Sequence, residues 1–384
     1  MLEQEFEWFF TTHSQTLRKG GKWGFEVLML MSVAHLFGLY TPKEMADYLG
    51  IGCQSLYAHL KSLSLHSLQK LMLHFMVKQA AEQLHRVLSK SAATYSRAGI
   101  SMHVDDSVIE RVGKQIRCTY KWYSGRFKQV VTGNDLLGIV LSCNGLILPL
   151  HLMFCSKQGR ANTTKPELLV KMLSELKDLF AQEGIDITGI PLTMDSWFAS
   201  EDLRQQLLAL GFKNLLVAGK SPYVFTIDGQ KRSAQEWKLQ LKLNDPQWGV
   251  EVPHLRTKAE SPTFGTVVLF FFSKQTTRVF YLMDLSCVPG RGAEIWKIWE
   301  QHHRIEQFWR LLKSVFRIKS IQLRGDGLYA GLLIKVIAFL LVLRLQAQNA
   351  FKNLSVVQTL RKIRREGSLD TLIDEHFHAL ISRI

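Results

Sequence analysis

The stretch Ser101-Met102-His103-Val104-Asp105-Asp106-Ser107 decides the fold prediction, because an apolar, strand-like run ends there in two carboxylates. The stretch Pro191-Leu192-Thr193-Met194-Asp195 repeats this pattern. A basic and aromatic segment from residue 299 to residue 313 has the pattern of a helix and carries Glu306. An acid at the end of each of two strands and a third acid on a helix predict one acidic site.

The overall charge indicates the class of partner. The chain has 384 residues, which is enough for two or three domains and a sizeable core. Its 48 Lys and Arg exceed its 33 Asp and Glu, so the net charge is +15. A balance this basic favours a polyanionic partner, most commonly nucleic acid.

Cysteine usage and hydropathy bear on the compartment. The five cysteines are scattered without a CxxC pair, which argues against a disulfide framework or a zinc site and for reduced thiols. The acidic start, Met1-Leu2-Glu3-Gln4-Glu5, is unlike a signal peptide. The most apolar run, residues 328–343, contains Lys335 and is shorter than the roughly 20 residues that span a bilayer. We expect a buried core helix, a cytoplasmic protein and no membrane partner.

The central part of the chain changes from helical to strand-like periodicity at about residue 97. Asn144-Gly145 between two apolar runs predicts a β-hairpin, and the capping box Thr164-Lys165-Pro166-Glu167 predicts a helix start. The predicted order is strands at 100–104, 129–142 and 146–154, a helix from 164, a strand at 187–194, a helix at 200–210 and a strand at 214–218. This order predicts an α/β fold with a mixed sheet and flanking helices, as in ribonuclease H-like folds.

The same periodicities divide the chain into four parts. We expect a helical N-terminal DNA-binding domain at 1–96 and the first part of a ribonuclease H-like catalytic domain at 97–220. Residues 221–290 have an irregular, β-rich pattern and are predicted to form an insertion. Residues 291–384 are predicted to be helical and include the acid Glu306.

Two short helices near the N-terminus match the helix-turn-helix pattern, whose second helix lies in the DNA major groove. Thr41-Pro42-Lys43-Glu44 can cap the first helix, and Gly50 permits the turn. On the second helix, Leu56, Leu60 and Leu63 are expected to face inward. The residues expected to face DNA are Gln54, Ser55, Tyr57, His59 and Lys61. An ordinary helical hairpin is the alternative.

The acids suit phosphodiester transfer. Two divalent ions about 3.5–4 Å apart, held by carboxylates, neutralise charge on the entering and leaving oxygens. Mg²⁺ prefers hard oxygen ligands and keeps several waters, so a few acids suffice. We predict that Asp106, Asp195 and Glu306 are the catalytic residues and hold two Mg²⁺ or Mn²⁺ ions.

Each acid has a simpler interpretation as well. An acid at a strand end is usually a turn or cap residue, and Glu306 could form an i, i+4 ion pair with Arg310. Strand alternation places Asp105 and Asp106 on opposite faces and does not choose between them. Cations near Glu306 are expected to bind the DNA backbone; they are His302, Arg304, Arg310, Lys313 and Arg317.

These motifs resemble those of DDE transposases of bacterial insertion sequences, specifically the insertion-sequence-four group. Asp106-Ser107 is similar to the first motif, an Asp followed by Ser or Thr, and this similarity favours Asp106 over Asp105. Met194-Asp195-Ser196-Trp197-Phe198 is similar to the second motif. Glu306 and Lys313 match the third, a signature of Tyr, two residues, Arg, three residues, Glu, six residues and Lys.

The resemblance covers about residues 98–345 and includes the β-rich insertion. Two positions depart from the signature: Trp299 stands where Tyr is expected, and His302 where Arg is expected. In the family these two positions contact phosphate near the cut end. In part of the group an aromatic residue of the insertion receives a flipped base. Trp237 and Trp248 lie in that region, where an ordinary core or surface role is the expectation.

The resemblance implies a bacterial, nucleoid-associated transposase that binds the terminal inverted repeats of its own element. Two ends would be paired in a homodimer on double-stranded DNA. Metal-activated water would cut the strand, and the freed 3′-hydroxyl would attack target DNA. The alternatives are a non-catalytic helix-turn-helix regulator or domesticated transposase and, less favoured, a ribonuclease H-like nuclease or resolvase.

Overall fold

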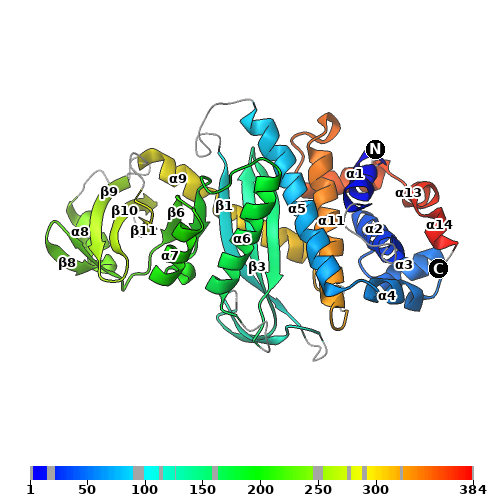
Figure 1. Cartoon of the computed structure of the whole chain (residues 1–384), viewed down its shortest axis with the longest axis horizontal. Coiled ribbons are helices and arrows are strands. Elements are labelled where there is room, and N and C mark those ends of the chain that lie inside the picture. Colours follow the sequence, from blue (N-terminus) through cyan, green and yellow to red (C-terminus); the bar gives the residue numbers. More distant parts are fainter. Residues whose placement is uncertain are drawn as a thin grey trace. The chain divides into compact units, whose positions relative to one another are not determined.

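The computed structural model describes residues 3–14, 22–89, 99–111, 116–125, 127–157, 163–244, 254–274, 278–287, 292–320 and 323–382. It confirms the predicted α/β class, with a large mixed sheet and flanking helices (Figure 1). The chain forms two compact units. The first contains residues 1–79, 107–136 and 307–384, and the second contains residues 80–106 and 137–306.

The central strands of the sheet follow the predicted pattern. β1 runs parallel to β5, and β5 runs parallel to β6, while β3 lies between β1 and β4. Asn144 and Gly145 turn the β3–β4 hairpin with φ of 49° and 79°, the conformation for which Asn-Gly is suited. The bounds are β1 Ser101–Glu110, β3 Gln129–Cys143, β4 Leu146–Phe154, β5 Leu192–Met194 and β6 Leu215–Ala218.

Two helices connect these strands, and their starts are locally encoded. Before α6 (Lys165–Gln182), the Thr164 hydroxyl accepts a hydrogen bond from the amide of Glu167, and the Glu167 carboxylate accepts one from the amide of Thr164. The predicted capping box is therefore confirmed. Ser200 caps α7 (Glu201–Ala209) in a similar way, through the amide of Leu203.

The β-rich insertion extends the main sheet instead of forming a separate subdomain. From β6 the sheet continues through β11, β10, β9, β7 and β8, and β11 pairs with β6 in an antiparallel register that sets Met283 opposite Val217. A Cβ on Gly219 would lie 2.0 Å from the Tyr281 ring, so this junction requires glycine. The elements are β7 Val224–Ile227, β8 Gln230–Ser233, α8 Ala234–Asn244, β9 His254–Ser261, β10 Gly265–Lys274, β11 Arg278–Asp284 and α9 Gly292–Glu300.

The first unit is mainly helical and is built around α11 (Gly327–Gln346). This helix alone, among those the structure describes, is long and apolar enough to cross a membrane, but 94% of its apolar window is buried inside the protein. The predicted core helix is confirmed. Around it lie α1 Glu3–Ser14, α2 Lys22–Leu36, α3 Pro42–Leu49, α4 Cys53–Lys61, part of α5 Leu65–Leu88, α12 Val356–Glu366, α13 Leu369–His376 and α14 His378–Ile381.

The two helices of the predicted helix-turn-helix form where expected. Thr41 and Glu44 make the capping box of α3, and Gly50 ends that helix with φ of 68°. Leu56, Leu60 and Leu63 are buried, as predicted. α4 approaches α2 so closely that a Cβ on Gly24 would lie 2.9 Å from Leu63 Cγ.

Lys335 lies in the middle of α11 with no exposed surface. Its Nζ donates to Ser320 Oγ at 2.8 Å and to the Tyr40 carbonyl at 3.3 Å, and it also contacts His35 Nε2. Burial, with help from Arg111 and Arg317, lowers the pKa of Lys335 to about 6, although Glu44 opposes the shift. A buried amine is thus satisfied by hydrogen bonds and held close to neutrality.

Some elements differ from the predictions. β2 (Tyr120–Ser124), which pairs with the start of β3, was not expected. The strand predicted at 187–194 is reduced to β5 at its end. The helix predicted to run through residue 313 divides into α10 (His303–Arg310) and a π-helical turn at Leu311–Val315.

Candidate active site

The parallel pairing of β1 and β5 brings two of the predicted acids to the same sheet edge. His103 is paired with Thr193, and Val104 with Met194. Asp105 and Asp195 are the next residues along the two strands. β5 ends at Met194, whereas β1 continues past Asp105 to Glu110, so the two acids lie at the same level of neighbouring parallel strands.

Strand alternation determines which of the two adjacent acids faces Asp195. His103 Nδ1 and Thr193 Oγ1 are hydrogen-bonded at 2.7 Å, so these paired residues project from the same face. Asp105 and Asp195 each lie two residues further on and share that face. Asp106 projects from the other face, where Lys165 Nζ at the start of α6 lies 2.9 Å from its Oδ2.

The Asp105 carboxyl is affected by its burial and by the charges of three other acids. Burial raises the pKa of Asp105 to about 8, and the charges of Asp106, Asp195 and Glu306 add to the rise, against a hydrogen bond from the Asp106 amide. Glu306, on α10, and Asp195 therefore both act on the Asp105 carboxyl, as Asp106 does. The sequence motif favoured Asp106 as the first acid. Asp106, the residue favoured by the motif, pairs with Lys165, and its role as a metal ligand stays a prediction.

A buried chain of hydrogen bonds supports this edge of the sheet. Thr193 Oγ1 contacts both His103 Nδ1 and His302 Nδ1 at 2.7 Å. His103 Nε2 lies 3.0 Å from Ser142 Oγ and 3.2 Å from Ser101 Oγ. Three strands and the start of α10 are thereby linked through one fully buried imidazole. Fully satisfied buried networks of this kind fix local geometry.

His302 does not carry the charge that was expected of it. Burial lowers its pKa to about 4, even though Asp195 raises it, so the ring is neutral at physiological pH. The ring stacks on Trp299 with centroids 4.6 Å apart and planes 6° apart. The two positions that depart from the transposase signature are therefore packed against each other.

An exposed aromatic residue borders the acids. Trp197 follows Asp195 in a short 3₁₀ turn and is 64% exposed. Lys220 Nζ lies 5.6 Å from the centroid of its ring, within range of a cation–π contact. An aromatic face next to a cation can contact a nucleic-acid base and a phosphate.

The other predicted DNA-binding residues are distributed over both units. Arg304 is half-buried in the second unit. In the first unit, Arg310 and Arg317 are exposed, with the Arg317 guanidinium 4.4 Å from the centroid of the Tyr40 ring. Lys313 lies in the π-helical turn. On α4, Gln54 and Lys61 are exposed, whereas Ser55, Tyr57 and His59 are half-buried.

The donor set fits a divalent cation by its chemistry, without forming a closed cage. Within the described part of the chain, no three His, Cys, Asp or Glu side chains are grouped closely enough to hold a metal ion by themselves. Mg²⁺ commonly takes one or two carboxylates and completes its shell with water and substrate phosphate. Asp105, whose negative form is disfavoured by burial and like charge, is the group that such a cation would stabilise most.

Comparisons with known proteins do not assign a family. No protein-family model matches the chain, and no curated protein matches it significantly. The functional argument therefore rests on the geometry of the acids and their supporting network.

The hydrogen-bond network was not found from the sequence. Its signal is the alternation of Ser101 and His103 on one face of an otherwise apolar strand, with Thr193 at the matching position before Asp195. Polar residues at alternate positions of a buried strand require partners. Recognising those partners needs the register between β1 and β5.

Proposed function

We propose that the chain is a DDE transposase that cuts DNA at the ends of its own element and joins the freed ends to a target. The observation that carries the proposal is the parallel pairing of β1 with β5, which sets Asp105 beside Asp195, together with the charge of Glu306 on α10 that acts on Asp105. In this proposal Asp105 takes the place of the first acid of the triad.

The order of elements supports a ribonuclease H-like catalytic domain. Apart from the short strand β2, strands β1, β3 and β4 are followed by α6, β5, α7 and β6, with β5 and β6 parallel to β1. This is the order from which the ribonuclease H-like fold was predicted. α10, which carries Glu306, follows only after the β-rich insertion.

Divalent ions held at this site, Mg²⁺ or Mn²⁺, would activate water and neutralise charge on the transferred phosphate. Asp105, Asp195 and Glu306 would hold them. Neutral His302 is oriented through its Nδ1 by Thr193, which leaves Nε2 as the ring nitrogen that can face DNA. Asp106 would anchor the start of α6 through Lys165.

The helix-turn-helix is proposed to recognise the terminal inverted repeats. Gln54 and Lys61 on α4 are exposed, while the leucines of the opposite face are buried. A net charge of +15 favours binding to double-stranded DNA. Two protein copies would be required to pair two element ends, so we propose a homodimer on DNA in the bacterial nucleoid.

The test is cleavage of a DNA fragment carrying candidate element ends in the presence of Mg²⁺ or Mn²⁺. The wild-type protein is expected to produce 3′-hydroxyl ends at the element boundary, and Asp195→Ala is expected to bind the same DNA without cutting it. Cutting that ignores the boundary would indicate a nuclease instead.

A non-catalytic DNA-binding regulator is the second candidate, favoured by the lack of a closed three-ligand group among the described residues. It predicts tight binding to the element ends by both proteins, with no cleavage by either one at any metal concentration. Such a result would contradict the transposase proposal.

A further inference from the structure

The β-rich insertion contains an open pocket, distinct from the acidic site, of about 700 Å³. It lies between α7, the β9–β10 hairpin and the segment after β11, all within the second unit. Three cations line it, namely Arg204, Arg256 and Lys258, against the single carboxylate of Glu201. The side chains that line the pocket therefore carry a net positive charge, although the charges of Asp284 and Glu260 also act on its Cys287.

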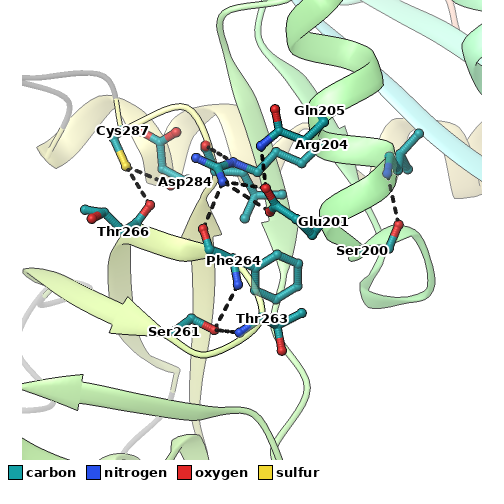
Figure 2. A network of polar contacts seen from close by, with 12 residues as sticks. Ser200, Glu201, Arg204, Gln205, Ser261, Thr263, Phe264, Thr266, Asp284 and Cys287 are labelled. Carbon is teal, nitrogen blue, oxygen red and sulfur yellow. Dashed lines mark hydrogen bonds and ion pairs between the residues drawn. The ribbon is translucent and has the colours of Figure 1, made fainter.

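Arg204 is the cation of this pocket whose side chain is held in place by hydrogen bonds. Its Nε donates to the Leu285 carbonyl at 2.8 Å, and its Nη1 donates to the Phe264 carbonyl at 2.8 Å and to both carboxylate oxygens of Glu201 at 3.1 Å (Figure 2). These bonds tie α7 to the hairpin turn and to the end of β11. Because Gln205 also contacts Glu201, that carboxylate is occupied and competes weakly with an incoming anion.

Arg256 and Lys258, on β9, are the exposed cations of the pocket. They lie two residues apart on β9 and project from the same face, opposite Phe270 and Val268 of β10. Both residues are exposed, while their cross-strand partners Val268 and Phe270 are buried. Glu260, the next residue on that face, accepts a hydrogen bond from Thr266 Oγ1 at 2.7 Å.

The structure assigns to this pocket the binding of a phosphate group, carried either by the DNA backbone or by a small phosphorylated ligand. An arginine fork and a lysine ammonium on one face suit the charge and geometry of phosphate oxygens. The volume is too small for a duplex and suitable for one phosphate with its attached sugar. This assignment does not depend on the catalytic proposal.

Cys287 provides a reporter inside the pocket. Its thiol donates to the Thr266 carbonyl at 3.3 Å, and the half-buried residue lines the pocket (Figure 2). Burial and the charges of Asp284 and Glu260 raise the pKa of this thiol, against the charges of Arg204 and Lys258. A phosphate bound between the cations would cover Cys287 and slow its alkylation.

The experiment measures the alkylation rate of Cys287 by iodoacetamide, with mass spectrometry to separate it from the other cysteines and with EDTA to exclude metal. Inorganic phosphate is compared with chloride at equal ionic strength. We expect phosphate to slow alkylation several-fold, and the Arg256→Ala/Lys258→Ala double variant to lose about tenfold or more in phosphate affinity. The matched control, Lys171→Ala/Lys213→Ala, removes two exposed lysines of the same unit outside the pocket and should retain protection.

A second arm replaces phosphate by a random-sequence DNA duplex. Protection at micromolar duplex, lost in Arg256→Ala/Lys258→Ala, would identify backbone phosphate as the ligand. Protection by inorganic phosphate alone would identify a small phosphorylated ligand. If the wild-type protein were alkylated at Cys287 at equal rates in phosphate, duplex and chloride, the inference would be overturned. Protection of Cys287 that persists in the double variant would overturn it as well. Loss of DNA cleavage with normal protection would concern only the transposase proposal.

Discussion

Two adjacent carboxylates, Asp105 and Asp106, have opposite environments because they alternate across a strand. The sequence identifies the pair but cannot distinguish its members, since both follow the same apolar run. The register of β1 with β5 distinguishes them. Asp105 projects from the same face of the sheet as Thr193, whereas Asp106 projects from the other face and forms an ion pair with Lys165. Register depends on tertiary pairing and cannot be obtained from one strand alone.

Substituting each of these two acids tests that assignment. Asp105→Asn is expected to reduce metal-dependent DNA cleavage by about a thousandfold or more, because it removes a charge that would stabilise the metal. Asp106→Asn should cost less than about tenfold, since it removes the ion pair with Lys165. Single-turnover cleavage at saturating Mg²⁺ measures both. A larger loss in Asp106→Asn than in Asp105→Asn would restore the assignment favoured by the motif.

Thr193→Val tests the buried network at the next position. Valine keeps the shape of threonine but removes the hydroxyl that contacts both His103 and His302. We expect a loss of about 1–3 kcal/mol in the free energy of unfolding, because two imidazole nitrogens lose a partner. Urea unfolding measures this loss. Thr257→Val, at a half-buried position of β9, is the control and should change the free energy of unfolding by much less.

At the scale of elements, the features that depend on neighbouring residues were predicted correctly, and those that depend on tertiary contacts were not. The capping boxes at Thr41 and Thr164 and the Asn-Gly hairpin depend on neighbouring residues only, and all three form. The π-helical turn at Leu311–Val315 and the strand β2 have no comparable local signal. β2 exists because it pairs with β3, and such a partner is invisible in the segment itself.

The element α4 carries a separate prediction about DNA recognition. Gln54→Ala/Lys61→Ala should weaken binding to an element end about tenfold or more while leaving the unfolding midpoint unchanged, because both side chains are exposed. Fluorescence anisotropy with a labelled duplex measures the affinity. Lys352→Ala, an exposed lysine of the first unit outside α4, serves as the control. Equal affinities for the two variants would exclude α4 as the recognition helix.

At the scale of the whole molecule, stability should depend on pH through Lys335. Its pKa is about 6 in the folded protein and near the ordinary value of 10.5 when unfolded. Between these values the unfolded chain binds the additional proton, so the free energy of unfolding should rise with pH, by up to about 1.4 kcal/mol per pH unit. The lowered pKa of His35 acts in the same direction, but only below its ordinary value of 6.5.

Lys335→Met removes the titrating amine and is expected to flatten this dependence between about pH 6.5 and pH 9. Denaturant unfolding at several pH values measures the slope. Lys352→Met, an exposed lysine, should leave the slope as in the wild type. An unchanged slope in Lys335→Met would show that the amine remains protonated in the folded state.

Because the strands of the insertion continue the main sheet, β8 is the edge strand at the insertion end of the sheet, among the residues the structure describes (Figure 1). An edge strand has unpaired backbone N–H and C=O groups that can pair with another extended chain, and this pairing promotes aggregation. β8 is only four residues long and presents Lys231 and Arg232, so two such edges repel each other. Copies of this protein that assemble on DNA are therefore not expected to meet through this edge of the sheet.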